Sequence, residues 1–520
     1  MIYLYSLPGL NLTYPEITNP MIKGNLKMNK VESKQVDLTI DFIDLLSQNK
    51  EFANLVKMLK SEDLLFEDRL DCNEKIRIFI GDFLKQYNLD YIKKKIVLKK
   101  NINTIDKLLE FLATSSKELE VFDSIFNINH FKDNDYLYIN VAYDFQFPYA
   151  LRLASKVKKS KNVKIIMGGN YLTHIKENIL EFMEKYDDVD AIHFYASYDS
   201  LLNIISFYDN SLESCNADCF LRVNDKIVSF NSKSLANKDM TVPDFSDLAL
   251  EKYLSYKIVV PMLLSKGCYY GKCNFCAHHY FYRCNEPLDI NKICECVLDL
   301  YNNYDVKGVI FVDECINPKN ILHFASYLIE KNIKINWLME TRISDDYLSD
   351  ENCKLLEKSG CKLITFGVES ASQRVLNLMN KGIEFKKAKA VLKKVHAYNI
   401  IVSSTYIIGY PNERKYEMYK TLNFLKKCKY LDGFGLSVFN FVRNSKIAIN
   451  SKIDGSKSLD LIYSYKGQNA QYLHEKLVNF YSNDKVKRYK MLRDKVLNRS
   501  DYLFLNKKDI SLNKICNMED

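Results

Sequence analysis

The sequence predicts an α/β protein in which a doubly wound, Rossmann-like domain precedes a partial (β/α)6 barrel and a small helical C-terminal cap. Two observations support this fold class. Apolar segments of strand length alternate with amphipathic helical segments in two separate series, and such alternation is typical of parallel sheets with right-handed crossovers. The chain also has 520 residues, which suggests two or three domains at roughly 100 to 200 residues each.

The composition is that of a folded protein, because 47% of the residues are apolar and 27% are charged. The net charge of +9 arises from basic residues interleaved with 65 acidic ones, so we expect no nucleic-acid partner. The N-terminal segment MIYLYSLPGL lacks the pattern of a leader peptide, and no apolar run approaches the roughly 18 residues of a membrane span. We therefore expect a cytoplasmic protein without membrane contact, with 14 reduced cysteines.

The first α/β series occupies residues 1–210. IYLYSLPG predicts a buried strand, and TNPMIKGNLK a helix after it. Residues from about 31 to 132 show helical periodicity without clear strands, which predicts a helical insertion. Strands and helices then alternate from YLYINVAY to SLLNIISFY. Residues 211–256 are predicted to form a linker with a small hairpin, because they are rich in Asn, Asp and Ser.

The second series occupies residues 257–450 and contains six strand segments. They are IVVPMLLSKG, GVIFVDE, INWLMETR, LITFGVES, IVSSTYIIG and FGLSVFN. Six β-α units are too few for a closed eight-stranded barrel, so we expect an open barrel with its active face at the carboxyl ends of the strands. Residues 451–520 are polar and helical in pattern, which predicts an appended cap.

A cysteine-rich loop, SKGCYYGKCNFCAHH, follows the first strand of the second series. Cys268, Cys273 and Cys276 could supply three thiolates to a 4Fe-4S cluster and leave the fourth iron open to another ligand. A zinc site is the alternative, with Cys284 or a neighbouring histidine, His278 or His279, as the fourth ligand. The later Cys294 and Cys296 are expected to pack as small apolar residues.

This loop resembles the signature of the radical S-adenosylmethionine (radical SAM) superfamily, although it has one additional residue between the first two cysteines. Its GCYYGKCNFC form is similar to a variant found among members with an N-terminal cobalamin-type domain. The resemblance implies a 4Fe-4S cluster on the three cysteines and S-adenosylmethionine as the ligand of the open iron. It also implies that Phe275, in the aromatic position of the signature, lies against the adenine.

Later strand ends extend the resemblance. FVDECI offers Asp313 and Glu314, which the family likeness places near the methionine amine, where an ammonium group needs a counter-charge. Helix capping before the following proline is the structural alternative for these acids. METR offers Glu340 and Arg342, and the resemblance implies contacts with the ribose and the carboxylate of S-adenosylmethionine.

The fourth and fifth strand ends carry the remaining predicted contacts to S-adenosylmethionine. GVES supplies Gly367, Glu369 and Ser370, where the serine could contact a ribose hydroxyl or cap the next helix. IIGYPNE is similar to the family's IxGxPxE turn. There Gly409 would permit close backbone approach and Pro411 would fix the exit of the chain.

The N-terminal domain resembles that of cobalamin-binding radical SAM enzymes. The likeness rests on three segments: LPGLNLTYPEITNPMIKGNLK, YINVAYDFQFPYALRLASKVK with Gln146, and VKIIMGGN with Gly168 and Gly169. Small residues at strand ends would let a flat macrocycle approach the backbone. The resemblance therefore implies a corrin between the two domains, with these three residues near it.

The Asp-x-His-x-x-Gly motif that supplies a cobalt-ligating histidine in many cobalamin domains is absent from this sequence. His130, His174 and His193 remain, and a lone histidine is more often a surface or core residue than a ligand. A domain that serves only as a scaffold or admits substrate is the alternative to cobalamin binding.

The sequence thus predicts a radical SAM enzyme that cleaves S-adenosylmethionine to a 5'-deoxyadenosyl radical, with ferredoxin or flavodoxin as electron donor. If cobalamin binds, the expected outcome is C-methylation of a peptide or other natural-product substrate. Cyclisation, epimerisation or rearrangement with a vestigial cobalamin domain is the second possibility. A zinc-binding interaction protein is the third. The sequence identifies no catalytic residue beyond the cofactor contacts.

Overall fold

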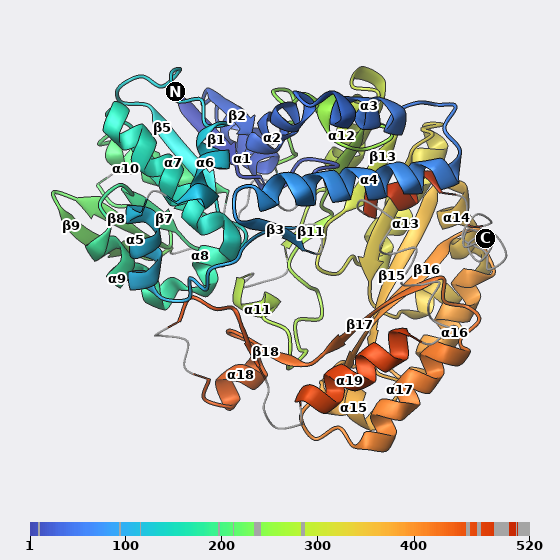
Figure 1. The fold of residues 1–520 in the computed structure, drawn as a ribbon. Coiled ribbons are helices and arrows are strands. Elements are labelled where there is room, and N and C mark those ends of the chain that lie inside the picture. The colour runs from blue at the N-terminus through green and yellow to red at the C-terminus, as the bar shows by residue number, and fades with distance from the viewer. Residues whose placement is uncertain are drawn as a thin grey trace.

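The computed structural model contains two parallel sheets, one in each half of the chain, which lie side by side (Figure 1). It describes residues 1–8, 11–92, 95–114, 116–195, 198–211, 213–232, 241–281, 286–453, 458–464, 470–482, 499–505 and 507. The α/β class predicted from the two alternating series is confirmed. In the described part of the chain, no helix combines the length and apolar character that a membrane crossing requires.

The N-terminal sheet has seven strands in the order β2-β1-β5-β6-β7-β8-β9. The first five in this order are parallel and the last two are antiparallel. Strands β1 and β5 are buried along their whole length, because helices cover both faces of a parallel sheet. The strands are β1 (Ile2–Ser6), β2 (Ser33–Asp37), β5 (Tyr136–Asn140), β6 (Lys164–Gly168), β7 (Ala191–His193), β8 (Cys219–Val223) and β9 (Lys226–Phe230).

Helices pack against the sheet in two layers. Helices α1 (Thr18–Met28) and α10 (Asp199–Tyr208) share one apolar core with the barrel, so they lie between the two sheets. The opposite face packs against a second core formed by the remaining helices of this half. They are α2 (Leu38–Ser47), α3 (Lys50–Leu59), α4 (Phe66–Lys85), α5 (Ile105–Ala113), α6 (Lys117–Asp123), η1 (Asp144–Gln146), α7 (Phe147–Ser160), α8 (Asn170–His174) and α9 (Lys176–Lys185).

The predicted helical insertion contains strands that the sequence pattern did not reveal. β2 pairs with β1 along the outer edge of the sheet, and β3 (Leu89–Ile92) and β4 (Lys95–Leu98) form a separate hairpin. The β2 segment, SKQVD, is short and largely polar. An edge strand buries little of its surface, so it need not carry the apolar alternation from which strands are recognised.

The hairpin expected between the domains is present, and it belongs to the N-terminal sheet. Strands β8 and β9 are joined by Asn224 and Asp225, which both have positive φ. That backbone conformation suits a tight two-residue hairpin turn. The chain then passes along α1, where Asp244 N–H donates to the carbonyl oxygen of Pro20, and through η2 (Leu250–Lys252) into the barrel.

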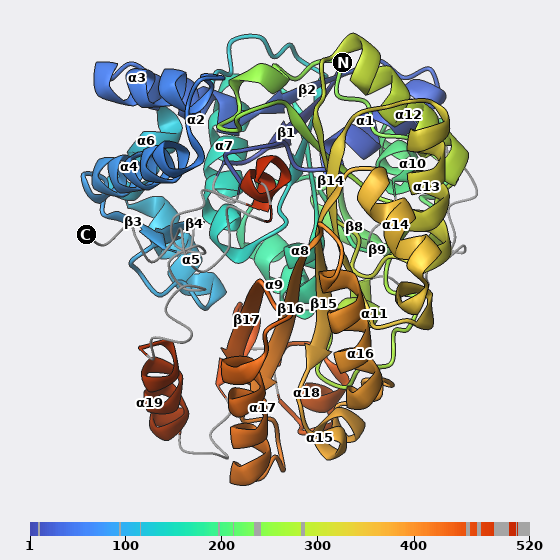
Figure 2. The ribbon, with the colours of Figure 1, turned by 90° about the vertical axis from the view of Figure 1, so that its right-hand side faces the viewer.

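The barrel sheet has six parallel strands in chain order, as predicted for an open (β/α)6 barrel. Its strands are β10 (Val259–Met262), β13 (Gly308–Phe311), β14 (Asn336–Thr341), β15 (Cys361–Glu369), β16 (Ile401–Ile408) and β17 (Gly433–Val438). The intervening helices are α12 (Ile290–Asn303), α13 (Pro318–Glu330), η3 (Asp345–Leu348), α14 (Asp350–Lys358), α15 (Gln373–Leu378), α16 (Phe385–His396) and α17 (Lys415–Lys427). These helices cover the outside of the curved sheet (Figure 2).

The C-terminal region is more than a cap. Helix η4 (Arg499–Phe504) lies against the barrel, where Leu503 and Leu505 pack among strand residues such as Val259, Ile310 and Leu338. Two further short strands, β18 (Asn440–Val442) and β19 (Ile462–Ser464), pair with each other. Helix α18 (Lys446–Asn450) follows β18, and α19 (Ala470–Tyr481) packs along β17. The rest of the predicted cap lies outside the described residues.

A pair of glycine substitutions tests the packing of α1. A Cβ atom on Gly24 would lie 1.8 Å from the carbonyl oxygen of Val242, whereas one on Gly81 would meet nothing closer than 4.0 Å. We expect Gly24→Ala to lower the free energy of unfolding by at least about 2 kcal/mol, since backbone must move to relieve the overlap. Gly81→Ala should raise it by up to about 1 kcal/mol, because alanine favours a helix interior. Chemical denaturation of the two variants measures both, and a tolerated Gly24→Ala would contradict this packing.

Candidate active site

The cysteine loop is anchored by a buried carboxylate from the neighbouring strand. Asp313 follows β13, and its carboxylate oxygens accept the backbone N–H groups of Leu264 and Ser265 at 2.7–3.1 Å, together with the Ser265 hydroxyl. Burial raises the pKa of Asp313 to about 7, although these hydrogen bonds oppose the shift. The expected contact with a methionine amine is not what the geometry shows. Asp313 instead fixes the backbone that leads into the cysteines.

The three cysteines lie together at the carboxyl end of β10, after the short strand β11 (Ser265–Lys266), which pairs with β12 (Glu286–Pro287). A hydrogen bond with the Cys315 thiol, backbone N–H groups of the loop and a nearby guanidinium lower the pKa of Cys268 to about 5. Burial raises the pKa of Cys273, and raises that of Cys276 to about 12. Metal binding would therefore release protons from these two thiols.

A buried layer of cationic side chains lies behind the cysteines. Arg342, at the end of β14, has Nη1 3.8 Å from Cys273 Sγ. Its guanidinium stacks 3.7 Å from the centre of the Tyr270 ring and donates to the carbonyl oxygen of Lys381. The Lys381 ammonium in turn pairs with Glu369 at 3.0 Å. Arg342 thus contacts the cysteine loop, where its positive charge can offset the negative charge of thiolates.

The predicted residues of the fourth strand form an internal network. Glu369 has φ +73° and accepts hydrogen bonds from Lys381 and from the Thr405 hydroxyl. A Cβ atom on Gly367 would lie 2.9 Å from both partners of the Glu369–Lys381 pair, so glycine makes room for that pair. The hydroxyl of Ser370 is fully buried and accepts from the backbone N–H of Ser372. The cap of the next helix, α15, is Ser372, whose hydroxyl accepts the N–H of Val375, so Ser370 supports the capping residue and is not the cap itself.

Two acids near the cysteines, Glu314 and Glu340, lie close to His278, which the sequence suggested only as an alternative zinc ligand. Glu314 pairs with His278 Nε2 at 2.8 Å, where α11 (His278–Phe281) begins. Burial lowers the pKa of His278, but the hydrogen bond to Glu314 and the charges of that residue and Glu340 outweigh it, so the net pKa is raised. These three side chains form a titratable group beside the cysteine loop.

The remaining predicted contacts lie on the fifth-strand side. Phe275 packs against a small apolar cluster that includes Met379 and Tyr410, and the Lys381 ammonium lies 5.8 Å from its ring centre. Gly409 has φ +76°, and its N–H donates to a Glu413 carboxylate oxygen at 2.5 Å. The positive φ explains the glycine. Pro411 then leads the half-buried turn toward α17.

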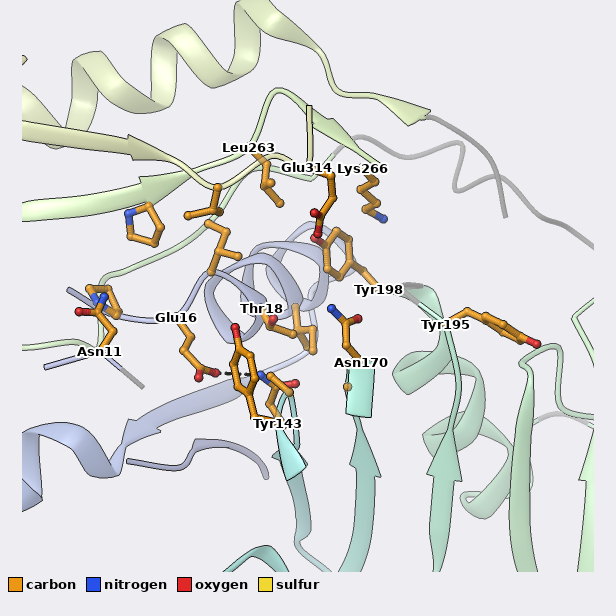
Figure 3. A pocket seen from close by; sticks show the side chains of 18 of the residues that line it. Asn11, Glu16, Thr18, Tyr143, Asn170, Tyr195, Tyr198, Leu263, Lys266 and Glu314 are labelled. Atoms are coloured by element: carbon orange, nitrogen blue, oxygen red, sulfur yellow. Dashed lines mark hydrogen bonds between the residues drawn. The ribbon is translucent and has the colours of Figure 1, made fainter. Parts of the chain in front are cut away.

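A pocket of about 270 Å³ lies between the two domains (Figure 3). Its N-terminal wall comes from the segments that follow β1, β5, β6 and β7, and its barrel wall from those that follow β10 and β13. The carboxyl edges of both parallel sheets therefore face one cavity. Its lining includes Asn11, Tyr14, Glu16, Thr18, Tyr138, Asn140, Tyr143, Gly169, Asn170, His193, Tyr195, Tyr198, Leu263, Lys266 and Glu314.

Two of the three residues predicted to approach a corrin act within the protein instead. Gln146 is fully buried, and its side-chain oxygen accepts the N–H groups of Ala142 and Tyr143. A Cβ atom on Gly168 would lie 2.1 Å from Nε2 of His193, so this glycine makes room for an imidazole. Gly169 does line the pocket, with φ +119°.

The three histidines of this domain have different surroundings. His193 lines the pocket and is 4% exposed, and burial lowers its pKa to about 4. His174 stacks with Tyr280 and has its pKa lowered to about 3, first by burial and then by nearby positive charge. His130 lies on the other face of the sheet, within 3.2 Å of the Tyr5 hydroxyl. His193 is thus the histidine of this set that faces the interdomain pocket.

Sequence reasoning missed Glu16, which lies in the pocket wall after β1. Burial raises the pKa of this carboxyl to about 7, although hydrogen bonds from Asn140 and Gln146 oppose the shift. Its only sequence signal is an acid in the segment YPEIT after an apolar strand. Cys315 was missed because a lone cysteine in a strand-end segment carries no spacing pattern.

Residues 262–425, the segment that holds the cysteine loop and four of the later strands, match the model of the radical SAM superfamily. This segment is a radical SAM domain. The matched range begins in β10 and ends within α17. It therefore covers the cysteines, the cationic layer behind them and every predicted contact to S-adenosylmethionine.

Curated relatives match more of the chain than this domain alone would fill. The chain is 22% identical over 362 residues to an uncharacterized methyltransferase of Pyrococcus horikoshii. That match covers 68% of this chain and 75% of the relative. It is 23% identical over 275 residues to the anaerobic magnesium-protoporphyrin IX monomethyl ester cyclase of Rubrivivax gelatinosus. That match covers 51% of this chain and 48% of the cyclase.

A solved structure extends the likeness to both domains. The cobalamin-dependent S-adenosylmethionine radical enzyme OxsB, with aqua-cobalamin and S-adenosylmethionine bound, superimposes with a TM-score of 0.62 at 13% identity. The match covers 98% of this chain and 70% of OxsB. At this identity the likeness shows the fold, and it confirms the order of a doubly wound domain followed by a radical SAM barrel.

The Glu369–Lys381 pair offers a test of the cationic layer. Both side chains are less than a tenth exposed, so removing one charge leaves the other buried and unpaired. We expect Glu369→Gln to lower the free energy of unfolding by about 3 kcal/mol. Lys381→Met in the same chain should restore at least about 1 kcal/mol of that loss, because the double variant buries no unpaired charge.

Lys387→Met is the matched control, since Lys387 pairs with Asp345 at the surface at a similar distance, 2.9 Å. It should change the free energy of unfolding by less than about 0.5 kcal/mol. Chemical denaturation of Glu369→Gln, Lys381→Met, their double variant and the Lys387→Met control measures the coupling. Additive losses in the double variant would show that the two buried charges do not support each other.

Proposed function

We propose that the protein is a cobalamin-dependent radical SAM methyltransferase that acts on a peptide or other natural product. One observation carries the proposal: the segment that leads into the cysteine loop, with Ser265, Lys266 and Gly267, lines the same pocket as the carboxyl edge of a doubly wound domain. A substrate in that pocket would have the radical-generating site on one side and a methyl donor on the other. Ferredoxin or flavodoxin in the cytoplasm would supply the electron.

The donor set fits a 4Fe-4S cluster. Cys268, Cys273 and Cys276 offer three thiols on one loop. Among the described residues, no three His, Cys, Asp or Glu side chains are grouped closely enough to hold a single metal ion. Cys284, the thiol considered as a fourth zinc ligand, lies outside the described residues. A bound cluster with S-adenosylmethionine would supply the 5'-deoxyadenosyl radical.

The chain's own residues set the electrostatics of that site. Arg342 places a fixed positive charge 3.8 Å from Cys273 Sγ, and Tyr270 covers the other face of its guanidinium. A cluster with three thiolates is anionic, so this charge would favour its binding and its reduction. Asp313 holds the loop backbone, which keeps the three thiols in one place while metal binds.

The pocket also fits a corrinoid on the N-terminal side. Its wall holds two buried side chains whose polar atoms have no partner among the described residues: the Asn140 amide oxygen and both His193 ring nitrogens. Buried polar atoms cost free energy unless they are hydrogen-bonded. They therefore favour a ligand with polar groups in this wall. Cobalamin, when bound, would supply the methyl group.

Cyclisation or rearrangement with the same initial radical is the second candidate. The match to an anaerobic ester cyclase favours it, because methyltransferases and a cyclase are both among the relatives. In this case the N-terminal domain would admit and orient the substrate without donating a methyl group. The pocket itself is equally available to both reactions, so products decide between them.

Replacing one cysteine tests the cluster assignment. We expect anaerobically reconstituted Cys273→Ala to fall well below about four iron per chain and to form no 5'-deoxyadenosine with dithionite, since three thiolates are needed to hold the cube. Cys353→Ala is the matched control, because Cys353 is also buried but lies in α14. It should retain both iron and activity. A colourless wild-type protein with one zinc would contradict the proposal.

The fate of the methyl group separates methylation from the alternatives. We expect the reconstituted enzyme to retain hydroxocobalamin on a desalting column. With methyl-labelled S-adenosylmethionine and a peptide mixture from the producing cells, label should enter a product, with one 5'-deoxyadenosine and one S-adenosylhomocysteine formed per methyl group. Formation of 5'-deoxyadenosine without transfer of label would instead support cyclisation or rearrangement.

A further inference from the structure

We propose that a small acidic electron-transfer protein docks over the outer face of the cysteine loop, on a surface formed by Tyr269, Lys272 and Lys446. This inference rests on the proposed radical SAM function, which needs one electron for each cleavage of S-adenosylmethionine. It deepens that function by assigning the place where the electron enters. Neither lysine belongs to the contacts predicted for the cluster or for S-adenosylmethionine.

The cysteine loop runs from the interdomain pocket to the protein surface. Ser265, Lys266 and Gly267 line the pocket, whereas Tyr269 is 38% exposed and Lys272 is exposed as well. A cluster on this loop would therefore have the pocket on one side and solvent close by on the other. Because electron transfer slows steeply with the distance between donor and acceptor, the exposed part of the loop is the favoured point of entry.

Two segments hold the outer face of the loop in place. After α15, the side-chain amide of Asn380 donates to the carbonyl oxygen of Lys272 at 2.9 Å, and the Asn380 carbonyl oxygen accepts the Tyr270 hydroxyl at 2.8 Å. On the other side, the N–H of Ile447 in α18 donates to the carbonyl oxygen of Asn274 at 2.9 Å. These contacts fix the loop at the surface, so a partner would meet a preformed site and would pay little to order it.

The two lysines give this face a positive charge. Lys446, the first residue of α18, is half-buried, and its ammonium donates to the carbonyl oxygen of Gly271 at 3.4 Å. In the part of the chain that the structure describes, neither Lys446 nor Lys272 pairs with a carboxylate. Two ammonium groups without a counter-charge therefore lie directly outside the cysteines.

The acids of a neighbouring depression have a lysine of their own. Asp345 and Glu384 line this depression together with Gly382 and Lys387. The Lys387 ammonium pairs with Asp345 at 2.9 Å. One of the two carboxylates is thus already neutralised, and the positive charges of Lys272 and Lys446 outnumber the one that remains.

An acidic one-electron donor fits this face. Charges at a protein surface act over about 8 Å at physiological ionic strength, and complementary charges raise the rate at which two proteins meet. Flavodoxin and ferredoxin are small, acidic and able to donate single electrons. The exposed ring of Tyr269 offers an aromatic contact between the two ammonium groups and the partner. The donor would lose one electron and a 4Fe-4S cluster in its 2+ state would gain it, with no bond made or broken.

Reversing both charges separates docking from chemistry. In the reconstituted full chain, we expect Lys272→Glu/Lys446→Glu to lower the second-order rate constant for reduction by flavodoxin hydroquinone at least about tenfold at low ionic strength. Each electron transferred leaves the flavin in its blue one-electron-oxidised form, which stopped-flow absorbance follows. The loss should shrink as salt is raised, and Lys272→Arg/Lys446→Arg should keep the wild-type rate. Iron content, and 5'-deoxyadenosine formation with the small reductant dithionite, should stay within about twofold of wild type.

Lys57→Glu/Lys75→Glu is the matched control, because these lysines are exposed on α3 and α4, far from α18 in both views of the fold (Figure 1, Figure 2). It changes the net charge equally and should slow reduction by flavodoxin less than about twofold. Equal losses in the two double variants, or no loss in either, would overturn the docking surface.

A single substitution covers the case in which the double reversal loses iron. Lys272→Gln removes one charge from an exposed side chain and should still slow reduction by flavodoxin about threefold at low ionic strength. An unchanged rate in that variant would overturn the proposal. If the wild-type protein forms no 5'-deoxyadenosine even with dithionite, the proposed function fails, and the docking surface fails with it.

Discussion

The carboxyl ends of parallel strands meet at one edge of a sheet. This protein has two such edges, one in each sheet, and its chemistry depends on both. In the N-terminal sheet the edge delivers Glu16, Asn140 and His193, and in the barrel it delivers the cysteine loop and Glu314. Helices α1 and α10 join the two sheets through one continuous apolar core. Because that packing brings the two edges face to face, a single pocket has residues of both domains in its walls.

The charged side chains buried at the barrel edge are each held by neighbouring groups around the cysteine loop. Asp313 is held by backbone N–H groups, Glu369 by Lys381, and Arg342 lies against Tyr270 beside the thiol of Cys273. A buried charge without a partner would cost several kcal/mol. These contacts therefore fix the residues around the cysteines and hold the Arg342 guanidinium beside Cys273, which suits an anionic cluster.

Local patterns in the sequence predicted much of this account. The cysteine spacing and the alternation of strands and helices are local, so they identified the loop, the barrel and the doubly wound sheet. Contacts between strands were harder to predict. Asp313 was expected to face a ligand, but its partners lie on the preceding strand-end loop. Gly168 was expected to admit a macrocycle, and it instead makes room for His193, a residue brought to it by the register of β6 and β7.

Anomalous X-ray scattering from anaerobic crystals grown with cobalamin and S-adenosylmethionine tests the central claim most directly. Data collected at the iron and cobalt absorption edges locate each metal independently of any assay. The account predicts iron beside Cys268, Cys273 and Cys276, and cobalt within the pocket between His193 and Glu314. Zinc scattering at the cysteines, or cobalt bound outside this pocket, would contradict it.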